Sequence, residues 1–182
     1  MGAVYSRVCG PPRKRLNVLM SGLGVSGKTS IQCRLKFGIF PTEICSYVST
    51  FFLLISEDIE INSSLSIFLH DLGSSPKMRE QHVRFWRDVA ALIYVVDCSD
   101  EDRLDEARIE LHEHLSDANM KDKSLLVIIS KRDLPNALSD EMLVDRLNLN
   151  VKGREWKIQS TSAKTGEGID VVAAWLEQLG DS

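Results

Sequence analysis

The chain has 182 residues, the size of one compact domain, and 43% of them are hydrophobic while 26% are charged. These proportions are typical of soluble globular proteins and exclude a chain that is disordered throughout. The net charge of −4 provides no broad positive field, so we expect no nucleic-acid partner. The four scattered cysteines do not have the spacing of a zinc site or a disulfide framework, and they favour a reducing compartment.

The N-terminus carries a pattern for lipid attachment. Its first six residues fit M-G-x-x-x-[ST], in which Gly2 is myristoylated after removal of the initiator methionine. One myristoyl chain binds membranes weakly, but acylation of Cys9 or the basic residues 13–15 would supply a second signal. The alternative is a solvated tail without lipid. We expect residues 1–15 to be a membrane-targeting segment and residues 16–182 to form one folded domain.

Beyond the N-terminal segment, short apolar runs alternate with longer segments of helical periodicity, which favours a parallel sheet covered by helices. Strands are predicted at residues 16–21, 51–61, 65–71, 92–97, 125–130 and 157–160. Helices are predicted at residues 28–37, 78–89, 102–117, 140–147 and 169–179. Residues 62–64 form a predicted hairpin turn, which makes the second and third strands antiparallel at the sheet edge. The predicted fold class is α/β, with a six-stranded, mostly parallel sheet between helices on both faces.

The strongest motif directly follows the first predicted strand. It is a complete G-x-x-x-x-G-K-[ST] sequence. The predicted phosphate-binding residues are its eight residues and the serine that follows them: Gly22, Leu23, Gly24, Val25, Ser26, Gly27, Lys28, Thr29 and Ser30. The glycines let successive backbone N–H groups curve around a phosphate, and the following helix adds its positive end. Lys28 is expected to reach the β- and γ-phosphates, and Thr29 to bind Mg²⁺. The alternative is a glycine-rich turn without a ligand.

Two later strands end in loops that suit a guanine base. Ser130, Lys131 and Asp133 follow the fifth strand, and Ser162, Ala163 and Lys164 follow the sixth, where ligands bind in open α/β sheets. Asp133 can accept the N1 and N2 donors of guanine, a pair that adenine lacks. The alternative is that Asp133 caps a turn and Lys131 is a solvated surface residue. Asp71 ends the third strand and is a predicted Mg²⁺ ligand through water.

With these motifs the chain resembles the small GTPases and, within them, the ADP-ribosylation-factor-like branch, over nearly its whole length. The similar segments are residues 22–23, 35–38, 92–99, 102–108, 133–137, 156–159 and 165–168. The resemblance implies a single P-loop G domain that binds GTP or GDP with Mg²⁺. It also implies a cytoplasmic switch in membrane traffic or signalling, attached peripherally to intracellular or plasma membranes through Gly2. Effectors, exchange factors and GTPase-activating proteins are the implied partners, and we expect the chain to be a monomer.

The second switch departs from the family pattern D-x-G-G-Q, because Gly73, Ser74 and Ser75 stand at its last three positions. The resemblance assigns the glutamine to orientation of the attacking water, which the shorter Ser75 side chain does not reach, so weak hydrolysis is predicted. Ser74 adds a Cβ where the family's glycine approaches the γ-phosphate. Gly73 and Ser74 remain predicted nucleotide contacts, and Lys28 and Ser75 are the predicted catalytic positions.

The guanine motif N-K-x-D begins with Ser130, so the resemblance implies that the asparagine tie to the phosphate loop is lost and affinity falls. The first switch, within residues 39–64, is longer than its family counterpart and lacks P-T-I-G-F. Thr50 is its predicted Mg²⁺ ligand, with Thr42 as the alternative; Thr50 is equally consistent with a strand residue.

The family's exposed aromatic triad falls on Leu53, His70 and Phe85, so its usual effectors are not expected to bind. His70 and His82 are interpreted as packed or solvated side chains rather than catalytic ones.

The leading hypothesis is therefore a guanine-nucleotide switch with weak GTP hydrolysis. The second is a pseudo-GTPase, a protein-interaction module that has lost hydrolysis and switches weakly or not at all. A small P-loop kinase is a third hypothesis, against which Asp133 and residues 162–164 argue.

Overall fold

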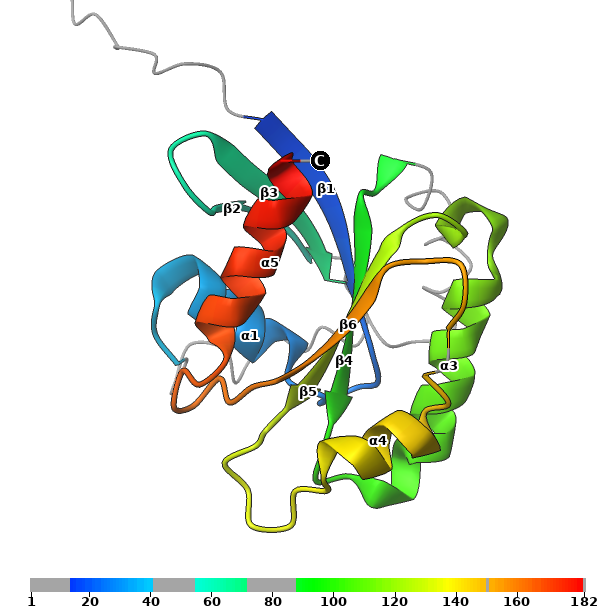
Figure 1. Ribbon diagram of the computed structural model, residues 1–182. Coiled ribbons are helices and arrows are strands. Elements are labelled where there is room, and N and C mark those ends of the chain that lie inside the picture. The colour runs from blue at the N-terminus through cyan, green and yellow to red at the C-terminus, as the bar shows by residue number, and fades with distance from the viewer. Residues whose placement is uncertain (1–13, 41–54, 72–87, 150, 182) are drawn as a thin grey trace, which may run out of the picture.

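The computed structural model describes residues 14–40, 55–71, 88–149 and 151–181 (Figure 1). The strands are β1 (Lys14–Ser21), β2 (Ile55–Glu60), β3 (Leu65–Asp71), β4 (Ala91–Asp97), β5 (Ser124–Ser130) and β6 (Trp156–Ser160). The helices are α1 (Lys28–Phe37), α3 (Leu104–Ser116), α4 (Asp140–Arg146) and α5 (Ile169–Asp181), with the 3₁₀ turns η3 (Glu101–Arg103) and η4 (Ala118–Met120). Among these, no helix is long and apolar enough to cross a membrane.

The six strands form one sheet in the order β2-β3-β1-β4-β5-β6. Only β2 runs antiparallel to its neighbour β3, and every other pairing is parallel. The turn between β2 and β3 is held by Asn62, whose Oδ1 accepts hydrogen bonds from the backbone N–H groups of Ser64 and Leu65 at 2.9 Å. The predicted fold class and the predicted hairpin are both confirmed.

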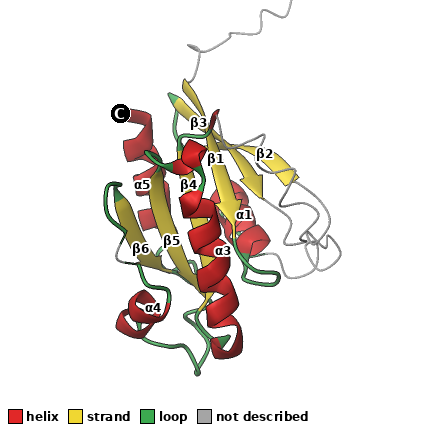
Figure 2. Ribbon diagram, turned by 90° about the vertical axis from the view of Figure 1, so that its right-hand side faces the viewer, coloured by secondary structure: helices red, strands yellow, loops and turns green. Residues whose placement is uncertain are grey.

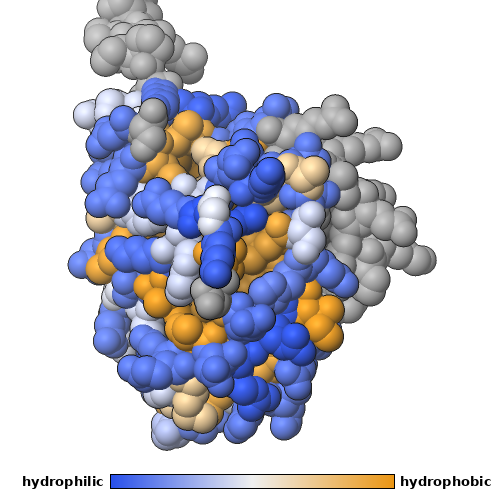
Figure 3. All heavy atoms as spheres, turned by 45° about the vertical axis from the view of Figure 1, so that its right-hand side comes forward, coloured by the Kyte–Doolittle hydropathy of each residue, from blue (hydrophilic) through white to orange (hydrophobic). Residues whose placement is uncertain are grey.

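The central strand β4 is buried along its whole length, and its alternating side chains supply both faces of the sheet. Leu92, Tyr94 and Val96 belong to the hydrophobic cluster under α3 and α4. Ile93 and Val95 belong to the cluster under α1 and α5. Figures 1 and 2 show these two pairs of helices on opposite sides of the sheet. The outer surface near α3 and α4 is mostly hydrophilic, with smaller hydrophobic areas between (Figure 3).

Several predicted boundaries differ from the structure. β1 begins two residues earlier than predicted, because the N–H of Lys14 continues the ladder by donating to Ser64 O at 2.8 Å. The helix predicted at residues 102–117 is divided into η3 and α3, since the Asp100 side chain binds Arg103 instead of capping the first turn. The predicted helix at residues 78–89 lies mostly outside the described residues, but Val89 itself is a core residue outside any helix. Residues 51–54 of the second predicted strand also lie outside them.

Candidate functional site

A tight glycine-containing loop, which we call the phosphate loop (residues 22–29), connects β1 to α1. Gly22 has φ 139°, and a Cβ at this position would lie 2.2 Å from the carbonyl oxygen of Val95 on β4. Gly27 has φ 99° and caps the N-terminus of α1. Glycine is the residue that adopts these backbone conformations without strain. The glycine spacing of the motif therefore follows from the way the loop passes the sheet.

A cavity of about 210 Å³ lies over the phosphate loop and is lined by residues 25–30 and by Lys131. The first backbone N–H groups of a helix have no intrahelical acceptors, so the start of α1 favours an anion at this place. Lys28 is 3% exposed, and its Nζ donates to the carbonyl oxygens of Gly22 at 2.7 Å and Leu23 at 3.0 Å. The ammonium group thus spans the mouth of the loop. This phosphate cavity has the size and polarity for the phosphates of a nucleotide.

A second cavity of about 150 Å³, which we call the base cavity, adjoins the first and shares Gly27, Ser30 and Lys131 with it. Its other lining residues come from the first turn of α1, the segment after α1, the end of β5, and the loops after β5 and β6: Ile31, Phe40, Ser130, Asp133, Leu134, Ala163 and Lys164. The structure therefore brings the predicted phosphate-binding and base-binding residues into one continuous site.

The carboxylate of Asp133 is oriented by the loop after β6. Ser162 is fully buried and donates from Oγ to Asp133 Oδ1 at 2.6 Å. Ser162 Oγ itself accepts the backbone N–H of Thr165 at 3.1 Å. Lys164 Nζ lies 3.9 Å from Asp133 Oδ2. An ionised carboxylate has about four acceptor positions, so it retains the capacity to accept the paired N–H groups of a guanine.

Lys131 is fixed between the two cavities by an ion pair that the sequence analysis missed. Its Nζ lies 2.6 Å from Asp97 Oδ2, and its backbone adopts φ 62°. Asp97 Oδ1 also accepts hydrogen bonds from the N–H of Ser99 at 2.9 Å and from its hydroxyl at 2.6 Å. Burial alone would raise the pKa of Asp97, but the bonds from Lys131 and Ser99 outweigh it and lower that pKa. Asp97 therefore stays ionised and positions the Lys131 side chain along the site.

Ser130 provides the tie to the phosphate loop that the sequence analysis expected to be lost. Its Oγ donates to the carbonyl oxygen of Ser26 at 2.5 Å and lies 3.0 Å from that of Val96. The shorter serine reaches the loop because Ser130 packs directly against it: a Cβ on Gly27 of the loop would lie 3.5 Å from Ser130 Oγ. The expectation of a missing tie was wrong, which removes the reason given for a loss of affinity.

The predicted magnesium ligands are only partly described. Thr29 lines the phosphate cavity, and Asp71 ends β3 opposite Met20 of β1, at the edge of the sheet from which the loop leaves. A hydroxyl and a carboxylate are oxygen ligands of the kind that Mg²⁺ takes, so this donor set fits the ion. The side chain of Asp71 is outside the described residues, as are the other predicted positions Gly2, Thr42, Thr50, Gly73, Ser74 and Ser75.

His70 is packed rather than placed for acid–base chemistry. It is 7% exposed, its Nδ1 lies 2.8 Å from Ser56 Oγ, and its ring contacts Phe68 edge to face. Burial, and then the charge of Arg15, lowers the pKa of His70. Leu53, His82 and Phe85 lie outside the described residues.

Polar side chains from η3 and α3 support the phosphate loop and the end of β1 that leads into it. Ser21 Oγ lies 2.8 Å from His114 Nε2 and 3.3 Å from Glu110 Oε1, and all three residues are buried. Arg103 donates to the carbonyl oxygen of Gly24 at 3.1 Å. Sequence reasoning missed these residues, as it missed Phe40 and Asp97. No local motif marks the α3 residues, whereas the position of Phe40 just after α1 was a weak signal.

Comparison with known proteins gives two findings. The family model described as the ADP-ribosylation factor family matches residues 3–179. The fold is similar to that of the Arl6 (BBS3) small GTPase from Trypanosoma brucei, solved with the bound nucleotide analogue GppNp. That match has a TM-score of 0.79 and 24% sequence identity, and it covers 92% of this chain and 98% of the other. At this identity the likeness shows the fold.

Proposed function

The chain belongs to the ADP-ribosylation factor family of small GTPases, and from this premise we propose that it is a guanine-nucleotide switch with weak intrinsic hydrolysis. The observation that supports this most is the pair of adjoining cavities, one over the phosphate loop and one beside Asp133, with Lys131 common to their lining. A nucleotide fills such a site with its phosphates over the loop and its base against Asp133.

In this proposal, the backbone N–H groups of the phosphate loop and the ammonium of Lys28 hold the phosphates. Thr29 holds Mg²⁺ directly and Asp71 holds it through water, and Thr50, with Thr42 as the alternative, is its predicted ligand from the first switch. When bound, the ion neutralises charge on the phosphate oxygens. Asp133 selects guanine, since it accepts the two N–H donors of that base, while Ser162 keeps its carboxylate in place.

The base assignment is tested by calorimetric titration with GDP, xanthosine diphosphate and ADP in the presence of Mg²⁺. We expect the unmodified chain to prefer GDP, and Asp133→Asn to prefer xanthosine diphosphate, because an amide can donate to the oxygen that replaces the amino group of guanine. Asp145→Asn, at an exposed position on α4, is the matched control and leaves the preference unchanged. An unaltered GDP preference in Asp133→Asn contradicts the assignment, and a preference for ADP in the unmodified chain favours a kinase.

Weak hydrolysis is proposed because Ser75 replaces the glutamine that orients water in this family. Single-turnover hydrolysis of preloaded GTP measures it. We expect Ser75→Gln to hydrolyse GTP faster than the unmodified chain, and equal rates contradict the role assigned to position 75.

The membrane part of the proposal depends on Gly2. We propose a cytoplasmic monomer held at intracellular or plasma membranes by a myristoyl group, acting in traffic or signalling with an exchange factor, a GTPase-activating protein and effectors. Mass spectrometry after co-expression with a myristoyltransferase, with Gly2→Ala as control, tests the acylation. An unmodified mass in the chain with Gly2 contradicts it.

A pseudo-GTPase is the second candidate, favoured by the loss of both the glycine and the glutamine at Ser74 and Ser75. It predicts nucleotide binding without turnover and without a difference in protease sensitivity between the GDP and GTP forms. A nucleotide-dependent difference supports the switch instead.

A further inference from the structure

The phosphate loop accepts a hydrogen bond from an arginine that does not line the phosphate cavity. Arg103 Nη1 donates to the carbonyl oxygen of Gly24 at 3.1 Å, and its Nε donates to Asp100 Oδ2 at 2.6 Å. Its Nη2 also binds the same carboxylate oxygen. Hydrogen bonding to Asp100 raises the pKa of Arg103, so the guanidinium remains charged. Arg103 is thus held by Asp100 on one side while it holds the loop on the other.

The bond to Gly24 determines where the next N–H points. The Gly24–Val25 peptide is trans, so its C=O and N–H groups point in opposite directions. A small cavity of about 10 Å³ lies between Arg103 and the back of the loop, lined by Leu23 and Ser26 among others. The carbonyl of Gly24 faces this side, and the N–H of Val25 therefore points away from Arg103. Val25 lines the phosphate cavity, whose lining does not include Arg103.

This arrangement is opposed by the backbone preference of Val25. The N–H of Ser26 donates to Leu23 O at 3.2 Å, which closes a β-turn with Val25 as its third residue. Val25 has φ 67°, a value that the third position of a type II turn requires and that glycine or asparagine normally supplies. A β-branched residue rarely adopts it. The Val25 side chain is 82% exposed, so burial does not hold it in this conformation.

The competing conformation is a type I turn, which has negative φ at the third residue and rotates the central peptide by roughly half a turn. Valine favours that turn, whereas the bond from Arg103 favours the observed one. In the type I form, the carbonyl of Gly24 rather than the N–H of Val25 would face the phosphates. A carbonyl oxygen repels a phosphate oxygen, so this form binds a nucleotide less tightly.

We propose that Arg103, braced by Asp100, is a positioning residue that keeps the Gly24–Val25 peptide turned so that the Val25 N–H faces the nucleotide phosphates. The inference rests on the proposed function, because its ligand is the phosphate group of a guanine nucleotide. The geometry of the phosphate loop in this chain then depends on a side chain from outside the motif.

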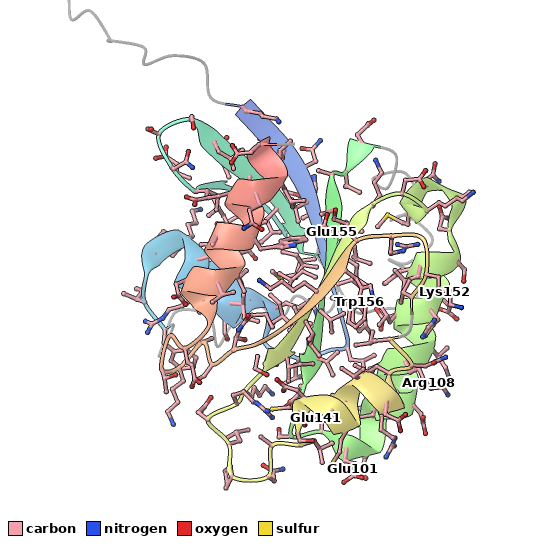
Figure 4. The ribbon with its side chains drawn as sticks, in the orientation of Figure 1. Glu101, Arg108, Glu141, Lys152, Glu155 and Trp156 are labelled. Carbon is pink, nitrogen blue, oxygen red and sulfur yellow. The ribbon has the colours of Figure 1, made fainter. Side chains whose placement is uncertain are left out.

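The test is the dissociation rate of GDP carrying a fluorescent ribose group, measured with Mg²⁺ and excess unlabelled GDP. We expect Arg103→Ala to release the nucleotide about tenfold faster, the effect of losing one hydrogen bond from a charged donor. Arg108→Ala is the matched control. Arg108 Nε lies 3.6 Å from Asp105 Oδ1, with the same i,i+3 spacing as Arg103 and Asp100, and Arg108 is placed on α3 away from the loop (Figure 4). Its release rate is expected to stay within about twofold of the unmodified chain.

The mechanism is separated from a merely structural effect by Val25→Gly, made alone and together with Arg103→Ala. Glycine adopts positive φ without strain, so the effect of Arg103→Ala is expected to shrink to about twofold or less in that background. An equally large effect in the Val25→Gly background overturns the inference, as does a normal release rate in Arg103→Ala.

If Arg103→Ala does not fold, Asp100→Asn loosens the same guanidinium and is expected to accelerate release in the same direction. Unchanged release in Asp100→Asn then overturns the inference. Failure of the unmodified chain to bind any guanine nucleotide overturns the proposed function and this inference together. Normal GDP binding with Arg103-independent release overturns this inference alone.

Discussion

Replacement of Ser130 by alanine tests whether the base loop and the phosphate loop are mechanically joined. The substitution deletes the hydroxyl that donates to Ser26 O at 2.5 Å and leaves that carbonyl without this donor. Loss of one partner of a buried hydrogen bond costs about 1–3 kcal/mol, and Ser130 is 2% exposed. We therefore expect the free energy of unfolding to fall by about 1–2 kcal/mol.

Nucleotide affinity is expected to fall as well, since Ser26 belongs to the loop that surrounds the phosphates. The apparent Kd equals the intrinsic Kd divided by the fraction of molecules whose loop is competent to bind, so it rises as that fraction falls. A tie worth about 1.4 kcal/mol sets an upper limit of about tenfold on that increase. Calorimetric titration with GDP and Mg²⁺ measures the affinity, and urea denaturation without nucleotide measures the stability.

Ser160→Ala is the control for this experiment, because Ser160 Oγ donates to Asp140 Oδ1 at 2.6 Å and makes no such bond to the phosphate loop. It is expected to lose stability without a change in Kd. Ser130→Asn, which restores the residue of the family motif, is expected to keep the Kd near that of the unmodified chain. If Ser130→Ala binds GDP as tightly as the unmodified chain, the link between the two loops is not part of the binding site.

Three further outcomes are expected. Phe40→Ala, which opens the wall of the base cavity, is expected to raise the Kd for GDP by about tenfold, the scale of one base–aromatic contact, while ADP titration serves as the comparison. Asp97→Asn removes the carboxylate that holds Lys131 and is expected to reduce the free energy of unfolding at pH 7. The difference in this free energy between the variant and the unmodified chain should vanish in acid, as the pH falls through the lowered pKa of Asp97. Burial and the charge of Arg15 lower the pKa of His70 in the folded chain, so the unfolded chain takes up the proton first as the pH is lowered. The free energy of unfolding therefore decreases as the pH drops below 6.5, the unperturbed pKa of histidine. Urea denaturation at pH 7.5 and 5.5 should show that His70→Gln loses less stability over this interval than the unmodified chain, by at most about 1.4 kcal/mol.

Local signals were sufficient to predict some elements. The bounds of α1 were predicted correctly because Gly27 and Gly38, both with positive φ, stand at its two ends. The bounds of β3 were predicted correctly because its apolar run starts after the Asn62 turn and ends at Asp71. The start of β1 was missed because Lys14 and Arg15 are exposed and polar, and they join the sheet through backbone hydrogen bonds that leave no hydrophobic pattern.

The candidate site was predictable to the extent that its residues belong to contiguous motifs. The phosphate loop, Asp133 and Ser162 occur in short segments whose spacing reflects the chemistry of phosphate and base. The supporting contacts depend on which distant segments meet in space, as when Arg103 reaches Gly24 and Lys131 meets Asp97. Ser130 was misjudged because the resemblance assigns the tie to an asparagine, whereas the reach of a serine to the loop depends on how β5 packs beneath it.

The central claim is that the site binds a guanine nucleotide, and the most direct measurement is the nucleotide released when the freshly purified protein is denatured. Chromatography against GDP, GTP and ATP standards identifies it. The account predicts GDP or GTP in near-stoichiometric amount, with GTP indicating that hydrolysis is stalled at Ser75. Release of an adenine nucleotide, or an empty protein that then fails to bind GDP or GTP with Mg²⁺, would contradict it.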